Sequence, residues 1–150
     1  MIPSTVVPSS LVDAVAAASI AASAGIILSL GLLHLLLTFR GAKLHPRDPE
    51  LEARLKSAQL IISRESSMWN AWVGFNASHS FGAIWFGAVY GYLALVHRSL
   101  LLGSAFLLGL GFLLLLGYLT LAKRYWFRVP FRGILLACLF YAAGLVCVWS

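Results

Sequence analysis

Charged residues are scarce in this sequence. Lys, Arg, Asp and Glu make up 11% of its 150 residues, whereas hydrophobic residues make up 61%, and the mean hydropathy is +0.90. A water-soluble domain carries roughly 25% charged residues, because its surface must be hydrated. The shortage of charge excludes a soluble enzyme, a disordered tail and a typical nucleic-acid-binding domain. The length allows one domain, and the composition predicts an integral membrane protein.

Cysteine is also rare. The two cysteines, Cys138 and Cys147, both lie in the last apolar segment. On a helix their spacing corresponds to a rise of about 13 Å, which is too long for a disulfide bond. The spacing matches neither a metal-binding motif nor a redox motif. We therefore expect packing or lipid-facing side chains, and no metal site.

Acidic residues are outnumbered by basic ones, five to eleven, which gives a formal net charge of +6. Ten of the eleven basic residues lie in two short segments, six within 40–64 and four within 123–132. Basic residues gathered between apolar segments set the orientation of membrane helices and attract anionic lipid headgroups. The charge therefore indicates the lipid bilayer as the partner, and no nucleic acid.

Four apolar segments are long enough to cross a bilayer, whose hydrocarbon core requires roughly 20 helical residues. They cover residues 11–39, 68–96, 99–122 and 133–149. Lipid offers no hydrogen-bond partners to the backbone, so all four are predicted to be helices. The predicted fold class is an all-α integral membrane protein, a single domain (1–150) of four transmembrane helices in an antiparallel bundle, with a short hairpin between the second and third.

The positive-inside rule fixes the expected orientation. The short hairpin places both basic segments on one face, which the rule makes cytoplasmic, so both termini are expected outside. No Lys or Arg precedes the first apolar segment, so we expect no cleaved signal peptide.

A polar segment, residues 49–67, separates the first two spans. Asp48 is a typical helix N-cap, and Pro49 suits the first helical position. Glu50 and Glu52 each precede a basic residue by four positions, a spacing that stabilises helices. The segment is predicted to be an amphipathic cytoplasmic helix leading into the second span, either on the membrane surface or continuous with the span. We favour a continuous or slightly bent helix, because no Gly or Pro interrupts residues 50–72.

The second span carries polar residues that are costly within a bilayer. Asn76, His79 and Ser80 recur at helical spacing, so they share one face, which Trp72 and Glu65 extend toward the cytoplasm. Polar groups at this depth normally face a bundle interior or a cavity.

His34 in the first span is the expected partner of this face. Counted from the ends of the spans, His34 lies about 7 Å deep, Asn76 about 12 Å and His79 about 16 Å. His34 should therefore reach Asn76, or the level of Trp72, more easily than His79. A depth difference of about 9 Å between the two histidines disfavours a haem with two histidine ligands.

These residues predict a binding site for a lipophilic molecule from the inner leaflet, such as a quinone, an isoprenoid or a lipid. The alternative is that they form only interhelical hydrogen bonds, worth about 0.6 kcal/mol each. The pattern indicates no particular cofactor, and it leaves open whether the protein is an enzyme. The expected ligand-binding residues are His34, Asn76, His79, Ser80, Trp72 and Glu65.

Small residues recur at four-residue spacing in the first two spans. Such ridges allow helices to approach closely, either within the bundle or at an interface with another chain. A second hypothesis is therefore a non-catalytic subunit or assembly factor of a larger membrane complex, or a homo-oligomer. The ridges comprise Ala17, Ala21, Gly25 and Ser29 in the first span and Ala83, Gly87 and Gly91 in the second.

Two stretches, Gly31–His34 and Gly74–His79, resemble a group of small four-helix bacterial membrane proteins of unassigned function. This resemblance implies a bacterial inner (plasma) membrane and the four-helix fold, but no activity. In length, topology and basic loop the chain also resembles the membrane-associated eicosanoid and glutathione enzymes (the MAPEG family). That family has an Arg-rich run shortly before an Asn and a Glu at the start of its second helix. The match here is weak, because Glu65 follows Arg64 directly and precedes Asn70. A MAPEG-like glutathione-dependent enzyme is therefore a minority alternative.

Overall fold

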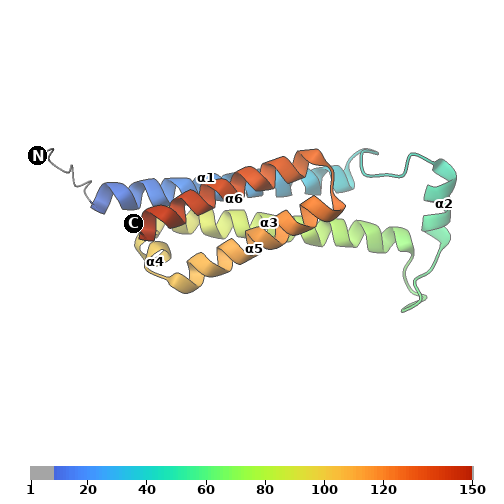
Figure 1. Cartoon of the computed structure of the whole chain (residues 1–150). Helices are drawn as coiled ribbons and strands as arrows, with labels where there is room; N and C mark the ends of the chain where they lie inside the picture. The colour runs from blue at the N-terminus through green and yellow to red at the C-terminus, as the bar shows by residue number, and fades with distance from the viewer. Residues whose placement is uncertain (1–8, 150) are drawn as a thin grey trace, which may run out of the picture. The chain divides into compact units, whose positions relative to one another are not determined.

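The structure, a computed structural model, describes residues 9–149. Four of the helices in this range are long and apolar enough to cross a membrane, which confirms the prediction of an all-α, four-span membrane protein (Figure 1). The helices are α1 (Ser9–Phe39), α2 (Pro49–Ser57), α3 (Met68–Val96), α4 (Arg98–Leu102), α5 (Ala105–Tyr125) and α6 (Arg128–Trp149).

The third span begins later than the sequence predicts. Instead of a continuous helix from residue 99, a short helix, α4, is followed by α5 at Ala105. The hydroxyl of Ser104 accepts a hydrogen bond from the backbone N–H of Leu107 at 3.3 Å, so Ser104 caps the start of α5. The Ser104 cap thus divides an apolar segment that hydropathy alone predicts as one helix. The connection between the second and third spans is therefore longer than the expected short hairpin, and it contains α4.

The expectation of a continuous helix from the polar segment into the second span is wrong. Helix α2 begins at Pro49 with Asp48 as its N-cap, as predicted, but it ends at Ser57. The hydroxyl of Ser57 bonds to carbonyl oxygens of its own last turn, and the hydroxyl of Ser67 caps α3 by accepting from the Asn70 N–H at 3.2 Å. The extended backbone of Ala58 ends α2, and the Ser67 cap starts a new helix at Met68, so the chain between them is a loop.

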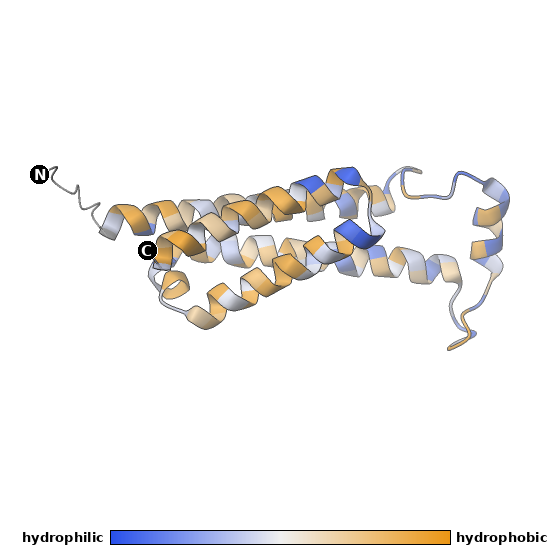
Figure 2. Ribbon diagram, viewed as in Figure 1, coloured by the Kyte–Doolittle hydropathy of each residue, from blue (hydrophilic) through white to orange (hydrophobic). Residues whose placement is uncertain are grey.

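The chain divides into two compact units, and α1 and α3 contribute to both. The first unit contains the chain up to Leu28 and from Trp85 onward, and the second contains Ser29–Ile84. Hydrophilic residues gather in the first unit at the end of α5 and the start of α6, and in the second unit along α2 and its flanking loops (Figure 2). These are the two basic segments of the sequence.

In the first unit the four long helices pack in a ring. Gly87 of α3 lies against Leu28 of α1, and the hydroxyl of Tyr90 of α3 donates to the Leu107 carbonyl of α5 at 2.7 Å. The hydroxyl of Tyr141 of α6 donates to the Leu108 carbonyl of α5 at 3.0 Å. Gly144 of α6 closes the ring against Ile20 and Ala16 of α1. Each apolar helix thus buries one face against two neighbours.

The small residues divide between two roles. Gly87 is buried, and a Cβ atom added to it would lie 2.7 Å from the carbonyl oxygen of Ala24, so Gly87 permits close approach within the chain. Gly25 is exposed, and a Cβ atom added to it would meet nothing within 4 Å. The predicted ridge on α3 therefore packs inside the bundle, whereas Gly25 on the predicted ridge of α1 faces outward.

Candidate functional site

The polar residues of the second unit meet where α1 and α3 approach closely. Gly31 is buried, and a Cβ atom added to it would lie 2.9 Å from the Cβ atom of Ala83 and 3.0 Å from the backbone nitrogen of Ile84. This contact sets the antiparallel register. Counting eight residues forward along α1 and eight residues back along α3 from this contact places Phe39 at the level of Phe75.

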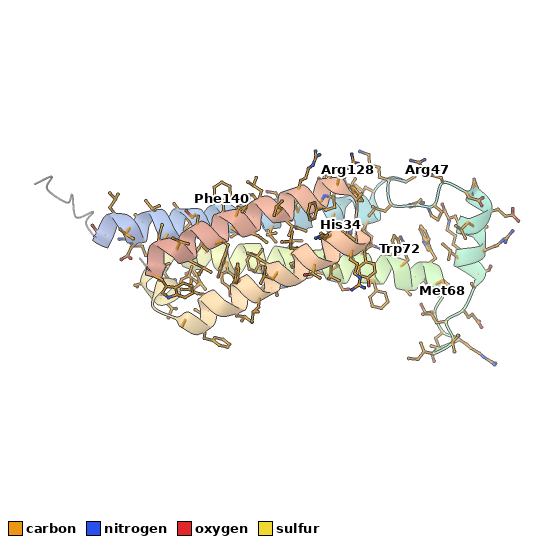
Figure 3. All side chains as sticks on the ribbon, in the orientation of Figure 1. His34, Arg47, Met68, Trp72, Arg128 and Phe140 are labelled. Atoms are coloured by element: carbon orange, nitrogen blue, oxygen red, sulfur yellow. The ribbon has the colours of Figure 1, made fainter. Side chains whose placement is uncertain are left out.

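His34, labelled in Figure 3, lies one turn along α1 from this contact and is hydrogen-bonded to Asn76 of α3. His34 Nε2 lies 2.9 Å from Asn76 Oδ1, and Asn76 Nδ2 donates to the carbonyl oxygen of Trp72 at 2.8 Å. A carbonyl oxygen can only accept, so the Asn76 amide nitrogen faces Trp72 and its oxygen faces His34. His34 Nε2 must therefore carry the proton, which assigns the tautomer when this histidine is neutral.

The two histidines are much closer than the sequence predicts. Their ring centroids are 5.6 Å apart, with the ring planes at 87° in an edge-to-face arrangement. The depths predicted from the sequence are wrong because they assume that Phe39 and Met68 lie at the same depth in the membrane. The register instead places Phe39 opposite Phe75, so α3 extends about 10 Å further than α1 at this end. His79 is thereby brought beside His34.

The six predicted site residues separate into two groups. His34, Asn76 and His79 are half-buried and form one cluster, here named the polar cluster, with the exposed Trp72 one turn away on the same face. Ser80 is fully buried, and its hydroxyl donates to the Asn76 carbonyl at 2.8 Å within its own helix. Glu65 lies exposed in the loop before α3, and no ion pair or hydrogen bond within residues 9–149 joins its carboxylate to the polar cluster.

A second network was not predicted from the sequence. His45 Nδ1 lies 3.1 Å from Glu52 Oε2, and the ring of His45 packs edge-on against Trp69 at 4.8 Å between centroids. Lys56 donates to Glu52 at 2.5 Å and also lies over the Trp69 ring at 5.3 Å. The sequence shows only the Glu52–Lys56 pair. The contacts of His45 depend on the path of the loop after α1, which bends at Gly41, a residue whose φ of +84° favours glycine.

This network lies outside the spans and changes the protonation of its carboxylate. The hydrogen bond from Lys56 holds the pKa of Glu52 below its ordinary value of 4.5, and His45 adds to the effect, against a smaller opposing effect of desolvation. Glu52 is therefore ionised at neutral pH. The network joins the loop after α1, helix α2 and the first turn of α3.

The polar cluster presents an amide and two imidazole rings, a set that can donate and accept hydrogen bonds. Among the described residues no group of three or more His, Cys, Asp or Glu side chains is arranged to hold a metal ion. The depth difference on which the sequence argument against a haem with two histidine ligands rests is absent in the structure, because the two rings lie beside each other. Comparisons with protein-family models, curated proteins and solved structures return no match.

Proposed function

We propose that this membrane protein binds a lipophilic molecule with a polar head through the polar cluster, His34, Asn76 and His79. The observation that carries the proposal is the His34–Asn76 hydrogen bond with a second imidazole ring 5.6 Å away, all on half-buried side chains. A single interhelical hydrogen bond requires only two polar residues. Ionisable side chains within a span are costly and usually functional, so the second histidine favours ligand binding over packing alone.

The chemistry of the cluster suggests the class of ligand. Imidazole N–H groups donate to carbonyl or phosphate oxygens, and an imidazole nitrogen that carries no proton accepts from a hydroxyl group. A quinone, an isoprenoid alcohol or a lipid headgroup meets these requirements. The apolar part of the ligand has a wall available, because Trp72 is 49% exposed and Phe75 is 73% exposed on the same stretch of α3. We infer that the ligand enters from the cytoplasmic leaflet of a bacterial inner membrane, toward which the positive-inside rule directs this end of α3.

The test is ligand retention by purified variants. The protein is extracted in a mild detergent, and bound small molecules are identified by native mass spectrometry and lipid analysis. We expect a stoichiometric lipophilic ligand on the unaltered protein and its loss from His79→Ala. Ser78→Ala is the matched control, because Ser78 is exposed on the same helix and bonds only to the carbonyl of Phe75.

Two results separate ligand binding from packing. Loss of ligand from His79→Ala with an unchanged melting temperature supports the proposal. A lowered melting temperature with the same bound molecules in all three proteins contradicts it, because the cluster then acts only to hold α1 and α3 together. Binding of added ubiquinone, followed by quenching of tryptophan fluorescence, provides a second measurement on the same variants.

A second candidate function is favoured by the outward face of α1 in the first unit. Ala18, Ala22 and Gly25 are exposed there, and small side chains are typical of surfaces on which a second membrane helix packs. In this alternative the chain is a subunit or assembly factor of a larger complex, or a homo-oligomer. Gly25→Leu should then reduce the assembled mass in native mass spectrometry while the chain stays folded, and an unaltered protein that purifies as a discrete monomer contradicts the alternative.

A further inference from the structure

The loop between α2 and α3 exposes two isoleucines outside the membrane-spanning helices. Ile61 and Ile62 are fully exposed, more so than any other large hydrophobic side chain in the described part of the chain. They lie in residues 59–67, here named the isoleucine finger. Two adjacent, fully exposed apolar side chains outside the spans favour a surface that contacts an apolar or interfacial environment.

The isoleucine finger has a defined base. Gln59 and Ser67 form an antiparallel bridge, and the backbone N–H of Met68 donates to the Ala58 carbonyl at 2.9 Å. Within the loop, the N–H of Glu65 donates to the hydroxyl of Ser63 at 3.1 Å. The bridge and the Met68–Ala58 bond close the loop at its base, next to the first residue of α3, and Ile61 and Ile62 lie in the part of the loop beyond that base.

The length of α3 indicates where the base of the finger would lie in a bilayer. Helix α3 has 29 residues and a length of about 43 Å, which matches the thickness of a bilayer including its headgroups, about 40–45 Å. A span of this length that is centred in the bilayer would begin at the edge of the headgroup layer, which is then the level of Met68. The finger extends beside the first turn of α3 rather than beyond its end, and its tip is hydrophobic (Figures 1 and 2). The finger would then be at the level of the headgroups, the level that the neighbouring Trp69 also prefers.

Charge complementarity identifies the surface that the finger meets. Within 40–67 two acidic residues, Glu50 and Glu52, are paired with Arg54 and Lys56. The remaining charged residues are four basic and two acidic, which leaves a surplus of two positive charges. The four basic residues are exposed, and they are Arg40, Lys43, Arg47 and Arg64.

We propose that the isoleucine finger inserts Ile61 and Ile62 into the headgroup layer of an anionic leaflet, next to the span that it precedes. Arg64, two residues from the tip, would contact the lipid phosphates. The finger and the network of His45, Glu52, Lys56 and Trp69 together hold α2 against the membrane surface. This role does not depend on ligand binding by the polar cluster.

The test measures the depth of the finger in nanodiscs. Ile62→Cys and the control Ala53→Cys are each made in a Cys138→Ala/Cys147→Ala background and labelled with an environment-sensitive fluorophore. Ala53 is an exposed α2 residue on the face opposite Leu51, so its label reports water above the membrane. Circular dichroism confirms that each variant is folded. The label is quenched in parallel by iodide in water and by a nitroxide attached to the lipid headgroup.

We expect the label at position 62 to be quenched severalfold more by the lipid nitroxide than the label at position 53, and severalfold less by iodide. The inserted fraction should be larger in phosphatidylcholine with phosphatidylglycerol than in phosphatidylcholine alone. Arg64→Gln should lower the ratio of inserted to exposed finger about fivefold in the anionic nanodiscs. Equal iodide quenching at the two positions overturns the proposal. Protection of position 62 from both quenchers also overturns it, because the finger is then covered by protein.

Discussion

Replacing Gly87 with alanine should weaken the packing of α1 against α3 in the first unit. The added Cβ atom would lie 2.5 Å from the Cβ atom of Leu28 and 2.7 Å from the carbonyl oxygen of Ala24. One of these atoms belongs to the backbone of a packed helix, so the helices must separate to make room. Overpacking of this kind costs about 1–3 kcal/mol. The better helix propensity of alanine offsets about 1 kcal/mol of that cost.

Gly74→Ala is the matched control for this experiment. Gly74 lies on the same helix, but a Cβ atom added there meets nothing within 4 Å, so only the helix propensity changes. The free energy of unfolding, measured by denaturant titration in the same detergent micelles, should therefore fall for Gly87→Ala relative to Gly74→Ala by about 1–3 kcal/mol. If the two variants are equally stable, α1 and α3 are not in the contact that the structure describes.

Two further predictions concern other contacts. The pKa of Glu52 is lowered, so its carboxylate stabilises the α2 segment above the unfolded-state pKa near 4.5, and this contribution is lost as the pH falls through the lower folded-state value. Amide-exchange protection of α2 should accordingly decrease between neutral pH and pH values below 4.5, whereas Glu52→Gln should show reduced protection already at neutral pH. Tyr141→Phe should lower the free energy of unfolding by about 0.5–1.5 kcal/mol, because the fully buried Tyr141 hydroxyl donates to the Leu108 carbonyl. Tyr125→Phe, at a residue 71% exposed, should leave that free energy unchanged.

The spans are the part of the fold that the sequence predicts best. Span length and apolar composition follow directly from the thickness and chemistry of a bilayer, so the second span is found at Met68–Val96 as predicted. The errors lie at the connections. A hydropathy pattern does not register the Ser104 cap at which α5 begins or the Ser67 cap at which α3 begins. Each cap is a local hydrogen bond between a side chain and the backbone, and it leaves the mean hydropathy of the segment unchanged.

The shared face of Asn76 and His79 could also be predicted, because it requires only helical periodicity. The position of His34 relative to that face could not, because register depends on how far each helix extends beyond the bilayer core. Gly31 determines the register through its contact with Ala83, but one small residue among many on α1 gives no sequence signal of its own. The network around His45 depends on the path of a loop, which periodicity does not describe.

The distribution of contacts bears on the choice between ligand binding and packing. Within a membrane, helices associate mainly through close packing of small residues, and an interhelical hydrogen bond adds only about 0.6 kcal/mol. In the second unit Gly31 already brings α1 against Ala83, and in the first unit Gly87 brings α3 against Leu28. The polar cluster therefore adds little to an association that the glycines provide, while two histidines within the spans carry the cost of a polar group in lipid. The cluster thus costs more in lipid than it contributes to packing, which supports ligand binding as its role. His79→Ala should therefore change ligand binding more than the free energy of unfolding.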